Sequence, residues 1–269
     1  MSEEDPVIQT NTDAALSKRD AVNKGYWHDP YIQYFVKSSE RKTPEISRGY
    51  YARVQGVKML LDRFLKLCGP ECQIVNLGAG FDTLFWRLMD DKAQFKSLVE
   101  VDLPAVTTRK CYYIRLRKQL LKGIATEDDD VRVSASDLHA GHYHLVGCDL
   151  RELDVFEAKV NMGDKFAEVM VENLKQRNCL LAGLQACTSI KAQEERICHA
   201  GWEVCKVWTM NQVYQSFPSM ELHRVEKLEM LDERELLDQL LSHYCLCVAY
   251  KGGGVPSKFE QLSFPLDPR

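Results

Sequence analysis

The chain has 269 residues, 45% of them hydrophobic, which is enough to fill the core of one large domain or two small ones. Its formal net charge of −4 and its pI near 6.0 exclude the basic surface that binds nucleic acid. No apolar segment reaches the roughly 20 residues that cross a bilayer, and the N-terminus is too polar for a signal peptide. The composition therefore predicts a cytoplasmic globular protein without nucleic-acid or membrane partners.

Predicted helices and strands alternate through the first half of the chain. Residues 1–17 are polar and are predicted to be a flexible N-terminus. Apolar residues then recur at helical spacing or form short β-like runs that end in polar residues. The predicted helices are 49–67, 84–88 and 107–122, and the predicted strands are 72–77, 97–102 and 143–148. This alternation is typical of the first half of a doubly wound α/β sheet.

The second half of the chain does not continue the pattern. No β-like run of five residues occurs between Leu150 and Ala200, where two helices are predicted instead. The predicted elements are helices at 165–184, 189–200 and 221–241, strands at 202–208 and 244–250, and a flexible tail at 255–269. The sheet therefore has five predicted strands and a gap where its middle belongs.

Cysteine, histidine and acidic clusters give little support for a metal site. The ten cysteines include no CxxC pair, and without an export signal we expect them to be reduced. The cluster of His139, His142 and His144 reads as a polar loop entering a strand, because alternate residues face one side of a sheet. The acidic run 127–130 reads as a solvated loop. No metal ligands are predicted.

The segment IVNLGAGFDT, residues 74–83, places two glycines directly after a predicted strand. A dinucleotide-binding loop needs a third small residue where Thr83 stands, so that fit is imperfect. S-adenosylmethionine instead needs close backbone approach and an acid at the end of the next strand, which Gly78, Gly80 and Asp102 supply. Asp149 ends the third strand. An ordinary α/β turn with structural glycines is the alternative interpretation.

Seven motifs, one of which contains this segment, closely resemble the leucine carboxyl methyltransferases. These enzymes methylate the C-terminal leucine of the protein phosphatase 2A catalytic subunit and so regulate phosphatase assembly. The similarity runs from about residue 18 to 253, with one break. The motifs are KRDAVNKGYWHDPYI (18–32), RKTPEISRGYYARVQGV (41–57), QIVNLGAGFDTLFWRL (73–88), VDLP (101–104), CDLREL (148–153), VNMGDKF (160–166) and HYCLC (243–247). The resemblance implies a Rossmann-like, S-adenosylmethionine-dependent methyltransferase fold with added helical lid segments.

The resemblance also implies a domain organisation and a cofactor site. One methyltransferase-like domain would span 18–254. Its parts would be an N-terminal helical lid (18–70), a cofactor-binding half (71–150), a helical substrate-side segment (160–200), and C-terminal strands and helix (201–254). Carried over by motif, S-adenosylmethionine would be bound by Lys18 and Arg53 at its carboxylate end, Gly78 at its aminoacyl backbone, Asp102 at its ribose, and Asp149 with Leu150 at its adenine.

No catalytic acid or base is nominated. The acceptor implied by the resemblance is a peptide C-terminal carboxylate, whose pKa near 3.5 leaves it ionised at neutral pH. The nucleophile therefore needs no general base, and catalysis would depend on orientation in a site closed to water.

The break in the resemblance lies between the motif CDLREL and Val160. The family has a strand-helix-strand unit of about 30 or more residues there, but here residues 151–159 run directly into VNMGD. The fourth strand of a doubly wound sheet lies beside the first at the ligand-binding edge, so its loss is not peripheral.

Three functional hypotheses follow. The first is a working carboxyl methyltransferase whose sheet has closed up by docking the last strand against strand one. The second is a shortened, non-catalytic relative that binds cofactor or phosphatase without methyl transfer. The third is a nucleotide-dependent oxidoreductase built on the same glycine loop, which Thr83 and the long motif matches disfavour.

Overall fold

The computed structural model describes residues 6–37, 41–125, 131–149, 189–251 and 259–265. The chain divides into two compact units, and the predicted single domain 18–254 is shared between them. The first unit comprises Met1–Asn23, Trp27–Arg41 and Cys68–Val155, and the second comprises Lys24–Tyr26, Lys42–Leu67 and Phe156–Arg269. Leu150 and the predicted helix 165–184 lie outside the described residues.

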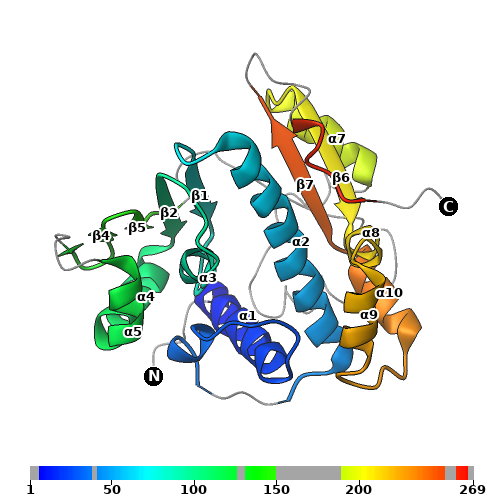
Figure 1. Ribbon diagram of the computed structural model, residues 1–269, viewed down its shortest axis with the longest axis horizontal. Coiled ribbons are helices and arrows are strands. Elements are labelled where there is room, and N and C mark those ends of the chain that lie inside the picture. Colours follow the sequence, from blue (N-terminus) through cyan, green and yellow to red (C-terminus); the bar gives the residue numbers. More distant parts are fainter. Residues whose placement is uncertain (1–5, 38–40, 126–130, 150–188, 252–258, 266–269) are drawn as a thin grey trace. The chain divides into compact units, whose positions relative to one another are not determined.

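The first unit contains a five-stranded sheet in the order β1-β2-β5-β4-β3 (Figure 1). Strands β1 (Gln73–Leu77), β2 (Ser97–Asp102) and β5 (Tyr143–Gly147) are parallel, as the sequence predicted for the first half of a doubly wound sheet. Two short antiparallel strands, β3 (Arg132–Val133) and β4 (Leu138–Ala140), extend it beyond β5 and were not predicted.

The helices of the first unit differ from the prediction at two places. They are α1 (Pro6–Asn23), the 3-10 helix η1 (Ile32–Tyr34), α3 (Leu84–Asp90), α4 (Pro104–Leu116) and α5 (Lys118–Ile124). Where the sequence was expected to be flexible up to residue 17, α1 begins at Pro6. The predicted helix 107–122 is two helices, because Arg117 adopts an extended backbone with φ −110° and ψ 106°.

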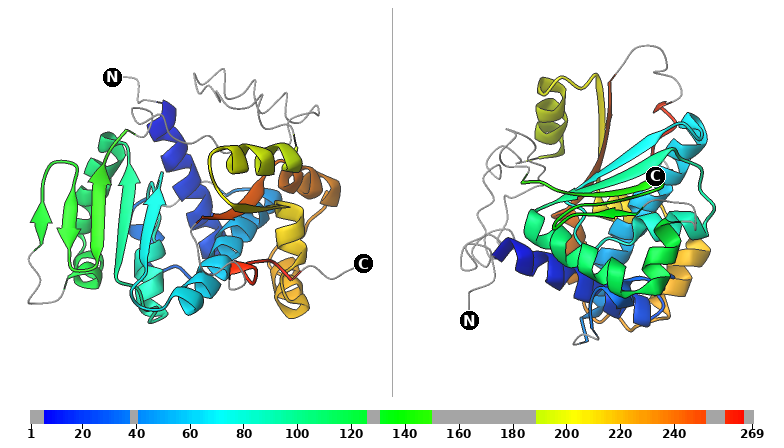
Figure 2. Two further views of the ribbon diagram at one scale, coloured as in Figure 1. Left: turned by 90° about the horizontal axis from the view of Figure 1, so that it is seen from above. Right: turned by 90° about the vertical axis from the view of Figure 1, so that its left-hand side faces the viewer.

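One face of this sheet is covered by helices. Figure 2 shows α4 and α5 along that face, and the rings of Phe85 and Trp86 from α3 pack on Tyr143 of β5 with centroids 4.8 and 5.4 Å apart. Leu98 of β2 and Leu145 of β5 point to the same face, and both are fully buried. Burial of these apolar side chains is the main force that holds the helices on the sheet.

The second unit contains a two-stranded antiparallel sheet and five helices among its described residues. They are α2 (Pro44–Cys68), α7 (Ile190–His199), β6 (Val204–Thr209), α8 (Met210–Gln215), α9 (Ser219–Glu226), α10 (Arg234–Ser242) and β7 (Cys245–Tyr250). The predicted helix 221–241 is therefore two helices, since residues 227–233 are not helical.

The suggestion that the last strand docks against strand one is wrong. The pairing partner of β7 is β6, in register from Val204 with Tyr250 to Thr209 with Cys245. Within the described part of the chain, β1 forms its ladder with β2 only and ends the order of its sheet. The sheet has not closed up in the way that was expected.

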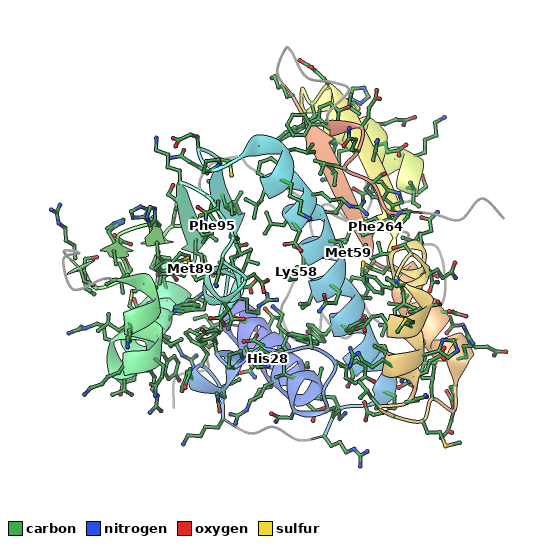
Figure 3. All side chains as sticks on the ribbon, viewed as in Figure 1. His28, Lys58, Met59, Met89, Phe95 and Phe264 are labelled. Carbon is green, nitrogen blue, oxygen red and sulfur yellow. The ribbon has the colours of Figure 1, made fainter. Side chains whose placement is uncertain are left out.

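Part of the predicted flexible tail is ordered against the second unit. Leu262 is buried, and so is Phe264, which is labelled in Figure 3. The Phe264 ring meets the Trp208 ring edge to face, with centroids 5.2 Å apart. Burial of these apolar side chains stabilises residues 259–265 against the rest of the second unit. The polar residues and prolines of this segment had instead predicted a flexible tail.

Candidate functional site

The loop between β1 and α3 requires glycine at two positions. Gly78 has φ +66° and Gly80 has φ +52°, a left-handed conformation that costs other residues free energy. A Cβ on Gly80 would also lie 2.4 Å from Oδ1 of Asn11 in α1, whereas one on Gly78 would have no atom within 4 Å. The loop is therefore tightly packed at Gly80 and opens into free space at Gly78.

The N–H groups of this loop are already used within the protein. Gly78 and Ala79 donate to Val101 O (2.8 and 3.2 Å), Gly80 to Asp102 Oδ2 (2.6 Å), Phe81 to Asn11 Oδ1 (3.0 Å) and Asp82 to Ala79 O (2.9 Å). A dinucleotide loop must offer such donors to a pyrophosphate. The arrangement therefore disfavours the oxidoreductase hypothesis.

Asp102 connects the glycine loop to the end of β2. Its Oδ2 accepts the Gly80 N–H at 2.6 Å and its Oδ1 accepts the Leu103 N–H at 2.7 Å. Each carboxylate oxygen has a second lone pair, so the group can still accept from a ligand hydroxyl. Asp102 therefore combines a structural role in the loop with acceptor capacity for a ligand hydroxyl.

The carboxyl ends of the parallel strands meet at one edge of the sheet. Asp102 is the register partner of Gly147, and Cys148 N–H donates to Asp102 O at 2.8 Å. Asp149 follows Cys148 in the chain, and Gly78 directly follows the end of β1. The structure thus brings Gly78, Asp102 and Asp149 to the same edge, where open α/β sheets bind their ligands.

The positive charge of Lys18 in α1 acts on Asp82 of the loop. Burial alone would raise the pKa of Asp82, but the positive charges of Lys18, Arg87 and Lys110 together lower it to about 2. Nη2 of Arg87 lies 3.5 Å from Asp82 Oδ1. Asp82 is therefore ionised at neutral pH, and Lys18 lies close enough to the loop to influence its titration.

A buried polar network supports the loop from the covered face of the sheet. Glu100, Lys110 and Tyr143 are all 0% exposed. Lys110 Nζ and Tyr143 Oη both lie 2.5 Å from Glu100 Oε2, and Nζ also donates to Asp82 O at 2.7 Å. Burial raises the pKa of Glu100, and the ammonium of Lys110 offsets part of that rise. Lys110 thus ties the backbone of the loop to the core.

Two predicted site residues are not brought to this edge within the first unit. Arg53 belongs to α2 in the second unit, where its side chain is exposed. Leu150 lies outside the described residues. The roles predicted for both stay predictions.

The histidine cluster spans the turn between β4 and β5, so His142 and His144 enter a strand as predicted, whereas His139 lies in the unpredicted strand β4. His139 of β4 and His144 of β5 are register partners whose Nδ1 atoms are 3.1 Å apart. His142 Nδ1 lies 2.6 Å from Lys96 O. Among the described residues, no group of three or more histidine, cysteine and acidic side chains is arranged to hold a metal ion.

Sequence reasoning missed Asn11 and the network of Glu100, Lys110 and Tyr143. Asn11, Ala15 and Lys18 recur at helical spacing, so reading residues 6–23 as a helix would have placed Asn11 beside Lys18. Glu100 is a charged residue inside the apolar strand SLVEVD. A charge in such a position usually has a buried partner, and that was the available signal.

Comparison with known proteins identifies the family. The model of the leucine carboxyl methyltransferase family matches residues 7–169. The chain is 39% identical to leucine carboxyl methyltransferase 1 of Bos taurus over 94% of this chain and 92% of the relative. The chain belongs to the leucine carboxyl methyltransferase family. It is therefore an O-methyltransferase of leucine carboxyl groups, and its parallel sheet with helices is the Rossmann-like fold expected for this family.

Two further relatives agree. Leucine carboxyl methyltransferase 1 of Rattus norvegicus is 38% identical over 93% of this chain and 91% of its own length. Probable leucine carboxyl methyltransferase 1 of Caenorhabditis briggsae is 35% identical over 93% and 92%. The alignment with the bovine relative spans 304 positions, more than the 269 residues of this chain. That relative therefore contains residues with no counterpart here.

The described residues fit S-adenosylmethionine at three points. The space in front of Gly78 would admit a ligand backbone without displacing a side chain. Asp102 offers acceptor capacity, and Nδ2 of Asn11 is a buried donor without a hydrogen-bond partner among the described residues.

None of the described helices combines the length and apolarity that a bilayer crossing requires.

Proposed function

We propose that this chain transfers a methyl group from S-adenosylmethionine to the α-carboxylate of the C-terminal leucine of the protein phosphatase 2A catalytic subunit, which would regulate phosphatase assembly. The observation that carries the proposal is the similarity to leucine carboxyl methyltransferase 1 over 92% of the length of the bovine relative. The strand-end acids and the open face of the glycine loop are consistent with it.

The proposed cofactor contacts follow the family motifs. Gly78 lets the aminoacyl part approach the backbone, Asp102 accepts from the ribose hydroxyls, and Asp149 with Leu150 meets the adenine. Lys18 and Arg53 bind the carboxylate. When bound, S-adenosylmethionine supplies an electrophilic methyl group.

The remaining work of this chain is orientation. A C-terminal carboxylate with a pKa near 3.5 is already ionised at neutral pH, so no side chain needs to remove a proton. If the carboxylate is held in contact with the methyl group and in line with the departing sulfur, the entropic cost of bringing the two reactants together is met by binding. This effect can account for a large part of a rate enhancement. We therefore expect a reaction rate that is nearly independent of pH between about 6 and 8.

The test is methyl transfer to a matched pair of peptides. One has the C-terminal sequence of the phosphatase catalytic subunit with a free carboxylate, and the other is the same peptide with a C-terminal amide. We expect radiolabel from S-adenosylmethionine only in the first, in a form that mild base releases as methanol. Equal labelling of both peptides, or a base-stable label, contradicts carboxyl methylation.

A second candidate function is a non-catalytic relative that binds cofactor or phosphatase without methyl transfer. The observation that favours it is the bovine alignment, which is longer than this chain. Binding of S-adenosylmethionine by calorimetry, combined with no label in the free-carboxylate peptide, would select this alternative.

A further inference from the structure

The side chain of Asn11 in α1 contacts the glycine loop directly. Its Oδ1 accepts the Phe81 N–H at 3.0 Å and occupies the space that a Cβ on Gly80 would need. This contact also fixes the amide orientation, because an N–H can donate to Oδ1 but not to Nδ2. The loop and α1 are therefore joined through one asparagine oxygen.

The other half of the same amide is unused. Nδ2 of Asn11 is buried, and it has no hydrogen-bond partner among the described residues. A buried donor without a partner is destabilising and is uncommon in folded proteins. A ligand with an acceptor at this position would remove that penalty.

Asn11 shares its face of α1 with Lys18. Seven residues correspond to almost two helical turns, and Ala15 between them is buried. Lys18 acts on Asp82, while Asn11 bonds to its neighbour Phe81. One face of α1 therefore brings a positive charge and a free amide donor to the same loop.

The chemistry of S-adenosylmethionine decides which of its groups such a face suits. The ammonium and the ribose hydroxyls donate hydrogen bonds and suit acceptors such as Asp102. The α-carboxylate can only accept, and it carries a negative charge. Of the polar groups on the ribose and aminoacyl parts, the carboxylate is the best match for an amide donor beside a lysine.

We propose that Asn11 is a cofactor-binding residue whose Nδ2 donates a hydrogen bond to the α-carboxylate of S-adenosylmethionine. This inference rests on the proposed function, because it takes S-adenosylmethionine as the cofactor. It adds to Lys18 a second contact from α1, with Oδ1 of Asn11 bonded to the loop and Nδ2 bonded to the ligand.

The test compares two substitutions at residue 11 by isothermal titration calorimetry. Asn11→Ala removes both the acceptor and the donor. Asn11→Asp keeps an acceptor for Phe81 N–H but puts a carboxylate oxygen where the donor was, facing the negative ligand. Gln9→Glu is the matched control, because it makes the same charge change at an exposed position of α1.

Two ligands separate binding of the carboxylate from distortion of the loop. S-adenosylmethionine carries the aminoacyl carboxylate, whereas 5′-methylthioadenosine lacks the whole aminoacyl part. We expect both Asn11 variants to bind S-adenosylmethionine about 10- to 100-fold more weakly, the range for a hydrogen bond to a charged group. Their affinity for 5′-methylthioadenosine, and the affinity of Gln9→Glu for both ligands, should change by no more than about twofold.

Three results would overturn the inference. Wild-type affinity of Asn11→Asp for S-adenosylmethionine would mean that Asn11 acts only as an acceptor for the loop. Equal losses for the two ligands would mean that the substitutions distort the loop. Failure of the wild-type chain to bind either ligand would overturn the cofactor assignment of the proposed function as well, and so differs from the first two.

Discussion

The two faces of the five-stranded sheet have similar apolar sequences but very different environments. On one face Leu98 and Leu145 are fully buried under helices. On the other, Val75 and Leu77 of β1 are 58% and 48% exposed. Sheets of this class normally carry helices on both faces. The strands of this sheet therefore retain apolar residues on both faces, as in a sheet with helices on both sides. The bovine relative contains residues that have no counterpart in this chain.

The largest effect is expected from removing the positive charge of Lys110, which is buried at the covered face of the sheet. Lys110→Met leaves the Glu100 carboxylate buried without its cation and frees the Asp82 carbonyl. We expect the free energy of unfolding to fall by about 3–5 kcal/mol, measured by chemical denaturation. Lys122→Met, at an exposed position of α5, is the control and should change it by less than about 0.5 kcal/mol. Equal losses in the two variants would mean that the network does not support the fold.

The difference in burial between the two faces can be measured by replacing one leucine on each face with alanine. Leu98→Ala removes a fully buried side chain and should cost about 2–5 kcal/mol through lost burial and a cavity. Leu77→Ala removes a side chain that is half exposed and should cost less than about 1 kcal/mol. Denaturation curves of both variants test this. Similar losses would show that the face of Leu77 is as well covered as that of Leu98.

The proposed binding of ribose at the carboxyl ends of the strands can be tested by a substitution of Asp102. Asp102→Asn keeps an oxygen that can accept the Gly80 N–H but removes the charge offered to the ribose hydroxyls. Calorimetry should show S-adenosylmethionine binding weakened by about 1.5–3 kcal/mol, the range for hydrogen bonds to a charged group. Unchanged affinity would refute the ribose role of Asp102.

The smallest effect is expected from the pH dependence of Asp82. Its pKa is lowered from 3.8 to about 2 in the folded state, so its ionised form stabilises the fold. That stabilisation is fully present above about pH 4 and is lost as the pH falls through about 2. Asp82→Asn should therefore cost about 1–2 kcal/mol at pH 7, and the difference from wild type should shrink below pH 4. A difference that stays constant from pH 7 to pH 3 would contradict this account.

The parallel part of the fold was predictable because its strands are β-like runs of five or six residues, separated by helices and ending in polar residues. The parallel register aligns the carboxyl ends of β1, β2 and β5. Gly78, Asp102 and Asp149, which stand at these ends, are therefore expected to lie at the same edge of the sheet. The family motif placed Lys18 at the cofactor, but the position of Asn11 beside the loop was missed, because residues 6–17 were read as a flexible segment and not as part of a helix. Tertiary contacts, rather than local sequence, hold that helix in place.

Other failures have different physical causes. Strands β3 and β4 have only two and three residues, which is too short for an alternating pattern to show. The pairing of β7 with β6 depends on long-range contacts that a single strand does not encode. Phe264 stands in a short segment rich in prolines and polar residues, which predicted a flexible tail, so its burial against Trp208 was missed.

The central claim is that the edge formed by Gly78, Asp102 and α1 binds S-adenosylmethionine in this chain. The most direct test is thermal unfolding of the wild-type protein with and without the ligand. A ligand that binds only the folded state, at 100 times its dissociation constant, adds roughly 2.7 kcal/mol of stability. We predict a cooperative transition that moves upward by several degrees. A cooperative transition that does not move at saturating ligand would contradict the claim.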